Sequence, residues 1–385
     1  MKSVAHVYPW DIIGDPGAVQ RILDLGVDAV ALAASYHTVR AATPLHPEHR
    51  LVDARHAALY VPVREQAWGG RRLTPAEPSW VDGPDSYGQA RDALKAAGLP
   101  VYAWTVLTHS SRLGDLAPEV VVRNAFGDRY PYALCTAQPE VVEYALTLVR
   151  EIVEQGQPDG VVLEACGPLG FFHGGHHEKT EGGDWGKVRQ ALLSICFCTA
   201  CAARCTEAGI EVDTLRAQVR NAVDAGEPDS VESALGAELA SALAAVRTSV
   251  VAQLRALLVG EVRELAPQAR VIVHASADPW ATGPFATAAP ELGVEVDAVV
   301  AMCWPGPEAS IPGIEALRKL APGTRIAGYV LALPPKPIEA AAMRAELAAL
   351  AAAGVQEFHL YHAGLASGAR LAVVREALDS LGQRP

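Results

Sequence analysis

Short runs of β-branched and aliphatic residues alternate along the whole chain with longer, alanine-rich stretches. Each run has the length of a strand and ends in a polar or aromatic residue, whereas the alanine-rich stretches repeat apolar positions at helical spacing. A small acidic turn precedes several runs, which is typical of a helix that leads into a parallel strand; Asp28, Asp159 and Asp297 lie in such turns. Eight strands are predicted, at residues 5–10, 27–35, 99–107, 160–165, 269–276, 296–304, 325–331 and 357–362.

Eight strand–helix units predict an α/β protein with a (β/α)8 TIM barrel, formed as one domain by residues 1–385. A doubly wound open sheet is the alternative, and it is disfavoured because no Gly-x-Gly-x-x-Gly follows the first strand. A barrel needs about 250 residues. The surplus lies mainly in insertions after strands two and four, at about 37–86 and 166–228. A long helix over about 230–266 is expected to pack on the barrel wall.

Aromatic and titratable residues are frequent where the predicted strands end. In a barrel these ends meet at one rim, where barrel enzymes hold their catalytic groups. Tryptophan and tyrosine rings stack on the CH faces of a sugar, while polar groups bind its hydroxyls, so the pattern favours a carbohydrate ligand. The candidate substrate-binding residues at this rim are Trp10, Tyr36, His37, Arg40, Trp104, His109, His274, Trp304, Tyr329 and Tyr361, and His362 also ends strand eight.

Glu164 is the first candidate for a catalytic residue, because it follows the apolar residues 160–163 directly. A carboxylate there is costly unless it has a function or a partner. Desolvation at such a strand end would keep it protonated near neutral pH, as a general acid in glycoside hydrolysis requires. The alternative is a salt bridge to a rim arginine. Asp11, Glu178 and Asp278 are the candidates for a second catalytic carboxylate, and its distance from Glu164 would distinguish retention from inversion.

Residues 173–179 form a dense polar group after strand four. One interpretation is substrate binding and proton transfer by His173, His176, His177, Glu178 and Lys179. A second is a catalytic metal held by His173, His177 and Glu178. A solvated loop without a role is the third.

Cysteines are concentrated in the run ICFCTACAARC, which contains Cys196, Cys198, Cys201 and Cys205. Thiolates at this spacing favour a tetrahedral zinc ion, and spacing alone proposes Cys205 as the fourth ligand. Buried thiols that merely pack are the alternative.

Three features together resemble the zinc-containing bacterial β-galactosidases and their relatives, which are clan A glycoside hydrolases. These features are Asp-Gly-Val-Val-Leu-Glu at 159–164, the Cys-x-Cys-x-x-Cys stretch after it, and a lone Cys135 before Pro-Glu-Val. The chain is also similar to a set of actinobacterial glycosidase-like proteins, through residues 104–109, 124–128 and 173–179.

The resemblance implies a (β/α)8 barrel, an acid/base role for Glu164, and a structural zinc ion. The implied zinc ligands are Cys135, Cys196, Cys198 and Cys201, with Cys205 spare. Clan A retaining enzymes also place a nucleophilic glutamate at the end of strand seven, but residues 325–331 contain no carboxylate. The chain therefore departs from that pattern at the second catalytic position.

The net charge of −12 and the lack of a Lys/Arg run argue against a nucleic-acid partner. The sequence contains no uninterrupted apolar stretch of about 20 residues, so no membrane span is predicted. No signal peptide is recognised at the N-terminus. Free thiols favour the cytoplasm. A homo-oligomer that associates through the long alanine-rich helix is compatible with the sequence.

Three functions remain compatible with the sequence. The favoured one is a cytoplasmic glycoside hydrolase that cleaves a glycosidic bond with a carboxylic general acid. The alternatives are a metal-dependent sugar isomerase or lyase, and a carbohydrate-binding barrel without catalytic activity.

Overall fold

The structure is a computed structural model that describes residues 1–172, 178–289 and 292–382. Eight parallel strands close into a barrel, because β1 pairs with both β14 and β2. The predicted TIM barrel is therefore confirmed and the open sheet is excluded. The barrel strands are, in order around the ring, β1 (Lys2–Val7), β2 (Ala29–Tyr36), β6 (Val101–Val106), β9 (Gly160–Glu164), β10 (Arg270–Ser276), β12 (Ala298–Met302), β13 (Arg325–Leu331) and β14 (Glu357–Tyr361).

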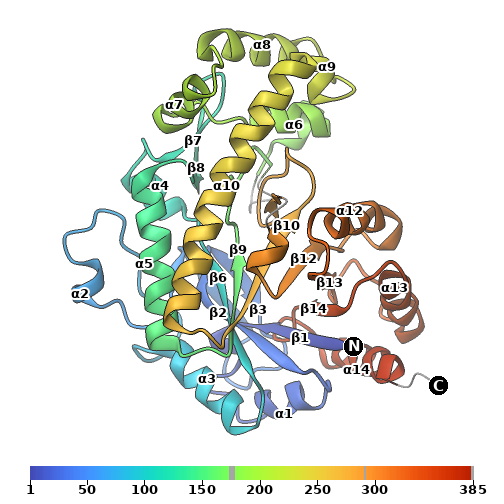
Figure 1. Cartoon of the computed structure of the whole chain (residues 1–385). Coiled ribbons are helices and arrows are strands. Elements are labelled where there is room, and N and C mark those ends of the chain that lie inside the picture. Colours follow the sequence, from blue (N-terminus) through green and yellow to red (C-terminus); the bar gives the residue numbers. More distant parts are fainter. Residues whose placement is uncertain (173–177, 290–291, 383–385) are drawn as a thin grey trace.

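A helix separates each barrel strand from the next, and these helices surround the barrel (Figure 1). Their apolar faces pack on the outward side chains of the strands in one continuous core. The helices are α1 (Ala18–Leu23), α3 (Ser86–Ala96), α5 (Pro139–Gly156), α10 (Ala237–Leu265), α11 (Leu292–Glu295), α12 (Pro307–Leu320), α13 (Ala340–Ala352) and α14 (Gly368–Gly382).

The acidic turns fix the amino ends of neighbouring strands. The backbone N–H of Ser3 in β1 donates to Asp28 Oδ2 at 2.7 Å, and that of Val101 at the start of β6 donates to Asp159 Oδ2 at 2.8 Å. The Val271 N–H in β10 donates to Asp297 Oδ2 at 2.7 Å. Each aspartate thus satisfies a backbone donor of the adjacent strand, which sets the register between the two strands.

Three long excursions leave the carboxyl ends of the strands. After β2 come β3 (Val39–Ala42), β4 (Leu51–Ala54), β5 (Ala58–Leu59) and α2 (Glu65–Trp68); after β9 come η2 (Glu181–Gly183), α6 (Lys187–Leu193), α7 (Thr199–Glu207), α8 (Val212–Asp224) and α9 (Val231–Leu235). The sequence analysis did not single out the third, which follows β6 and contains α4 (Ser111–Leu116), β7 (Val121–Arg123) and β8 (Arg129–Leu134). The short elements η1 (Pro9–Asp11) and β11 (Ala286–Thr287) follow β1 and β10.

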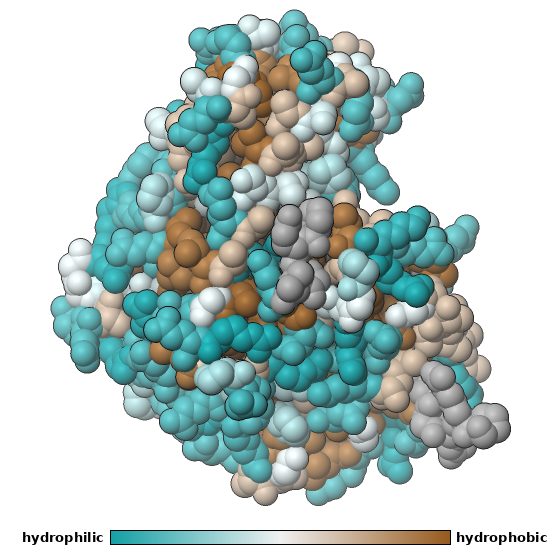
Figure 2. Space-filling model, viewed as in Figure 1, coloured by the Kyte–Doolittle hydropathy of each residue, from teal (hydrophilic) through white to brown (hydrophobic). Residues whose placement is uncertain are grey.

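Helices α6 to α9 gather in a lobe beyond the barrel, and α10 joins this lobe to the barrel wall (Figure 1). The lobe has its own buried apolar cluster, which includes Leu193, Leu215 and Val219. Figure 2 shows apolar side chains that reach the surface over this lobe. The expected single helix over 230–266 is wrong in one detail: Gly236, at φ +83°, ends α9 before α10 begins.

Within the described residues, α10 is long and apolar enough to cross a membrane by length and composition. It packs lengthwise against α5 on the barrel wall. It also carries the buried Arg255, which pairs with Glu295 at 3.2 Å. These contacts show that one face of α10 packs on the barrel.

A polar chain runs through the interior of the barrel. At the amino ends of the strands, Arg270 binds both carboxylate oxygens of Glu357, at 2.9 and 3.1 Å. His359 Nε2 lies 3.2 Å from Glu357 Oε1, and His359 Nδ1 lies 3.2 Å from His6 Nε2. His6 and His359 are thus buried residues of the barrel interior that are joined by a hydrogen bond.

Glu357 should contribute to stability through its charge. Burial alone would raise the pKa of Glu357, but hydrogen bonds from His359 and Arg270 outweigh burial and lower it to about 2. Because the folded-state pKa is below its ordinary value of 4.5, the contribution of ionised Glu357 to the free energy of unfolding is complete above pH 4.5. This contribution is lost as the pH falls towards 2.

We predict that Glu357→Gln lowers the free energy of unfolding by about 3–5 kcal/mol at pH 7, because it leaves the Arg270 charge without its partner in the barrel. Urea denaturation followed by circular dichroism measures this. Glu376→Gln is the matched control, since it breaks the exposed pair with Arg344 and should change stability far less. Equal effects of the two variants would contradict the assigned role of Glu357.

Candidate active site

Aromatic rings fill the carboxyl end of the barrel. Side chains alternate between the two faces of a strand, so alternate residues of each strand point into the barrel. Tyr8 stacks on Trp10 at a centroid distance of 4.4 Å and lies parallel to Trp104 at 5.8 Å. On the other side, Trp304 stacks on Tyr329 at 5.5 Å and lies 5.0 Å from Tyr361. The structure thus brings most of the predicted aromatic residues into one layer.

Glu164 lies within this layer and is only 5 % exposed. Its Oε2 accepts a hydrogen bond of 2.7 Å from the Trp104 indole N–H. Burial raises the pKa of Glu164 to about 7, although the Trp104 hydrogen bond opposes this shift. No arginine pairs with Glu164 among the described residues. The carboxyl group is therefore near its titration midpoint at neutral pH.

His274 is the second polar neighbour of Glu164. Its Nδ1 lies 3.5 Å from Glu164 Oε2, and its ring stacks on Phe285 at 4.6 Å. The imidazole is fully buried, and neither ring nitrogen has a hydrogen-bond partner within the described parts of the chain. Burial lowers the pKa of His274 well below its usual value, so the ring is neutral.

We call the aromatic carboxyl end of the barrel the mouth. The tyrosine hydroxyl groups of the mouth are also uncharged. Burial raises the pKa values of Tyr8, Tyr36 and Tyr329 well above their usual value. The hydroxyl oxygens of Tyr8 and Tyr361 lie 3.3 Å apart. The indole N–H groups of Trp10 and Trp304 are buried without an acceptor in the described structure. Such groups could serve as donors to ligand hydroxyls.

Asp11 is buried at the end of β1, where it belongs to η1. Its Oδ2 accepts a 2.8 Å hydrogen bond from the Tyr8 backbone N–H and lies 3.9 Å from His362 Nδ1. Burial raises the pKa of Asp11 to about 7, against the lowering effects of that hydrogen bond and of Arg21. Asp11 also lines a small cavity between the barrel wall and helices α1 and α14. It therefore lies in the wall, behind His362.

Other predicted residues lie around the mouth. His37 stacks between Tyr36 and His109, at 4.2 and 4.3 Å. Arg40 is exposed on β3, opposite Asp53 of β4. Their substrate contacts stay predictions.

Two further carboxylate candidates lie outside the buried layer. Asp278 is exposed and accepts a 2.9 Å hydrogen bond from the Trp280 N–H. Glu178 is half-buried and accepts one from Thr180, beside the exposed Lys179. His173, His176 and His177 lie outside the described residues.

The sequence analysis missed three residues of the mouth. Tyr8 contacts Trp10, Tyr36 and Trp104, and the period-two spacing from His6 could have revealed its inward direction. Phe285 comes from the loop after β10 and carries no local signal. His362 was recognised as a strand end but was not assigned to substrate binding.

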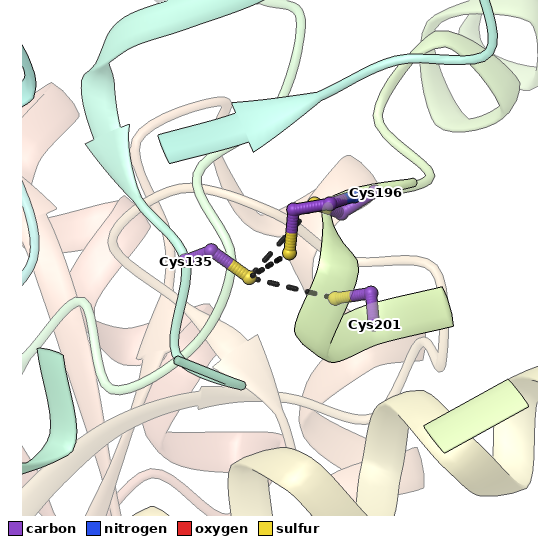
Figure 3. A group of neighbouring side chains, drawn as sticks. Cys135, Cys196 and Cys201 are labelled. Atoms are coloured by element: carbon purple, nitrogen blue, oxygen red, sulfur yellow. Dashed lines mark hydrogen bonds between the residues drawn. The ribbon is translucent and has the colours of Figure 1, made fainter. Parts of the chain in front are cut away.

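Four cysteine sulfurs meet between the barrel and the lobe. Figure 3 shows Cys135, Cys196 and Cys201 pointing towards one another. Cys135 Sγ lies 3.8, 3.6 and 3.4 Å from the sulfurs of Cys196, Cys198 and Cys201, and all four lie within 4.8 Å of one another. Cys205 lies elsewhere, buried in the apolar cluster of the lobe.

This cysteine group could hold a metal ion. Sulfurs bound at about 2.3 Å to a tetrahedral zinc ion are separated by about 3.8 Å, close to the distances observed. The backbone N–H groups of Arg123 and Cys198 both donate to Cys196 Sγ at 3.4 Å, which would stabilise a thiolate. The donor set and its spacing therefore fit a tetrahedral metal.

Arg247 of α10 connects the lobe to the rim. Its guanidinium donates to the carbonyl oxygens of Pro279, Ala281 and Trp280, at 3.3 to 3.5 Å. One turn further along α10, Val250 packs against the apolar cluster that includes Cys135 and Cys198. The loop after β10 is thereby joined to the helix that supports the cysteine group.

No protein-family model matches the sequence, and no curated protein matches it. Several solved structures with a similar fold are glycoside hydrolases. The catalytic domain of β-amylase from Paenibacillus polymyxa has a TM-score of 0.60 and 13% identity, covering 100% of this chain and 99% of that one. The β-galactosidase from Marinomonas ef1 has a TM-score of 0.60 and 13% identity, and the match covers 99% of this chain and 60% of that one.

The α-L-fucosidase isoenzyme 2 from Paenibacillus thiaminolyticus has a TM-score of 0.59 and 13% identity. Here the match covers 99% of this chain but 49% of the fucosidase, about half its length. The chain has the (β/α)8 fold of these hydrolases. At such low identity the likeness establishes the fold alone, and the chemistry must be argued from the residues of the mouth.

We predict that the metal content depends on Cys135 and not on Cys205. Cys135→Ser should lose the metal, because a neutral hydroxyl replaces one of four thiolates. Cys205→Ser should keep it, since that thiol lies outside the group. Elemental analysis of the purified variants measures metal per chain, and loss of metal from Cys205→Ser alone would contradict the assignment.

Proposed function

We propose that the protein is a glycoside hydrolase-like, carbohydrate-active enzyme in which Glu164 is the general acid. The observation that carries this proposal is the buried Glu164 carboxyl group, held by Trp104 in an aromatic mouth with a pKa of about 7. A carboxylic acid at that pKa can donate a proton to the leaving oxygen of a glycoside near neutral pH. The hydrolase fold of the structural neighbours supports this reaction class.

The lining of the mouth fits a sugar ring. Trp10, Trp104, Trp304 and the tyrosines offer flat apolar faces for the CH groups of a pyranose. The buried indole N–H groups of Trp10 and Trp304 and the neutral His274 offer hydrogen bonds to hydroxyls. These groups are the proposed substrate contacts, together with Tyr36, Tyr329 and Tyr361.

Zinc is the proposed occupant of the cysteine group, in a structural role. Four thiol ligands leave no open coordination position, as is typical of structural zinc sites. Cys135, Cys196, Cys198 and Cys201 would hold the segment after β8 to the start of α7. Seven free cysteines and a thiolate metal site fit a reducing compartment, so we infer a cytoplasmic protein.

One alternative rests on a specific observation. The seventh barrel strand, β13, carries Tyr329 and no carboxylate, so the barrel lacks the nucleophile that the clan A resemblance requires. A carbohydrate-binding barrel without catalytic activity would share the aromatic mouth. Turnover of any glycoside would exclude this alternative.

We predict that Glu164→Gln reduces hydrolysis of glycosides by about 10²–10⁴-fold, because it removes the transferable proton. The amide keeps the size of the side chain and can still accept the Trp104 hydrogen bond, so the melting temperature should be unchanged or higher. A panel of 4-nitrophenyl glycosides, with alkyl glycosides for comparison, measures kcat/KM. The decrease in kcat/KM should be larger for alkyl glycosides, whose leaving group needs protonation, than for activated aryl glycosides.

Glu376→Gln on α14 is the matched control and should retain full activity, since its side chain is exposed. Equal turnover by the wild type and Glu164→Gln would remove Glu164 from this role. Binding of sugars without turnover of any substrate by the wild type would favour the non-catalytic alternative.

We predict that Trp104→Phe moves the alkaline limb of the pH–rate profile to higher pH. The indole hydrogen bond lowers the pKa of Glu164, so its loss should raise that pKa and keep the acid protonated further into the alkaline range. The profile of kcat/KM against pH measures the shift. Trp304→Phe should weaken substrate binding without moving the limb, because the Trp304 indole makes no hydrogen bond to Glu164.

A further inference from the structure

A second carboxyl–imidazole pair faces the first across the barrel. Asp11 Oδ2 lies 3.9 Å from His362 Nδ1, and Glu164 Oε2 lies 3.5 Å from His274 Nδ1. Both pairs lie at carboxyl ends of strands, and all four side chains are at least nine-tenths buried. The first pair was identified from Glu164, whereas the second has no function in the site described so far.

The strand order places the two pairs opposite each other. Glu164 ends β9 and His274 lies in β10, the fourth and fifth strands of the ring. Asp11 follows β1 and His362 follows β14, the first and eighth strands. In a closed ring of eight strands, the fourth faces the eighth and the fifth faces the first. A ligand in the mouth would therefore lie between the two pairs.

His362 borders the same aromatic layer as Glu164. Its ring stacks on Tyr8 at 4.2 Å, lies 5.2 Å from Tyr361, and lies 6.1 Å from Trp104, the donor to Glu164. Both nitrogens of His362 are buried without a hydrogen-bond partner in the described residues. A neutral imidazole has one donor and one acceptor to offer, and neither is used within the described fold.

The contacts around Asp11 account for the burial of its carboxylate. They do not account for the unpaired nitrogens of His362. Asp11 accepts from the Tyr8 N–H, and Gly364 makes room for it, since a Cβ there would lie 2.0 Å from Asp11 Cγ. Asp11 lines a cavity of about 30 Å³, which has room for about one water. His362 does not line that cavity. Because Nδ1 is the nitrogen that faces Asp11, Nε2 remains for a ligand in the mouth.

We propose that His362, oriented by Asp11, is the proton acceptor that opposes Glu164, and that the enzyme hydrolyses glycosides with inversion. This inference rests on the proposed function. Glu164 gives its proton to the leaving oxygen as the glycosidic C–O bond breaks. A water attacks the anomeric carbon from the opposite face and gives its proton to His362, so that sugar and alcohol are released. The proton on His362 then returns to Glu164 through solvent.

The protonation states suit these roles. Burial lowers the pKa of His362 to about 3, so the imidazole is neutral near pH 7. The same burial weakens it as a base, so proton acceptance requires that an ionised Asp11 stabilise the imidazolium. A carboxylate behind an imidazole fixes its tautomer and stabilises the imidazolium that forms. The 3.9 Å separation fits an unliganded site, because such hydrogen bonds tighten when the substrate is bound.

The inference is tested with the glycoside that the wild type hydrolyses best. We expect His362→Asn and Asp11→Asn each to lower kcat by about 10²-fold or more, with KM little changed. Asp11→Asn keeps an oxygen for the Tyr8 N–H, so the fold at η1 is preserved. Their effects should be non-additive in the double variant, because the two residues act as one unit. His56→Asn, in the excursion after β2, is the matched control and should behave as the wild type.

Two readouts separate this role from a merely structural one. ¹H NMR of the first product should show the inverted anomer, and added imidazole should restore part of the activity of His362→Ala. Retained configuration, or full activity of His362→Asn, would overturn this inference and leave the proposed function standing. Failure of the wild type to hydrolyse any glycoside would instead reject both.

Discussion

Closure of the sheet between β1 and β14 determines where every side chain of the mouth lies. The register from Lys2↔Glu357 to Ala5↔Leu360 brings the first and last strands of the chain together. It places His6 beside His359 and continues to Tyr8 beside Tyr361. Without this pairing, Glu164 would lie in an open sheet with no opposing wall. The buried environment that raises the pKa of Glu164 is therefore a consequence of ring closure.

The ionisation of the buried side chains changes along the axis of the barrel. At the amino ends of the strands, Arg270 and Glu357 are charged and fully paired. Towards the carboxyl ends, burial without charged partners makes the imidazoles neutral and brings Glu164 and Asp11 close to their titration midpoints. The same desolvation thus has two outcomes: a carboxylate in a salt bridge stays ionised and stabilises the fold, whereas one without a salt bridge has a raised pKa.

The lobe supports the rim at a few defined contacts. The cysteine group joins the segment after β8 to the start of α7, and Arg247 joins α10 to the loop after β10. That loop is in turn bound to the loop after β9, because Gly283 N–H donates to Pro168 O and Ala165 N–H donates to Pro284 O. Glu164 directly precedes Ala165. The position of the proposed acid therefore depends on packing that begins outside the barrel.

The sequence by itself determined the barrel, its eight strands, and the candidates Glu164, Trp104 and His274, because strand periodicity and strand ends are local properties that a ring of strands repeats. It also contained the cysteine run, although only folding decides that Cys135 and not Cys205 completes the group, since their separation in sequence does not fix their separation in space. The position of Phe285 against His274 and the pairing of Asp11 with His362 depend on contacts between segments that are separated in the sequence. Those contacts, and the burial that shifts each pKa, arise only when the first and eighth strands meet.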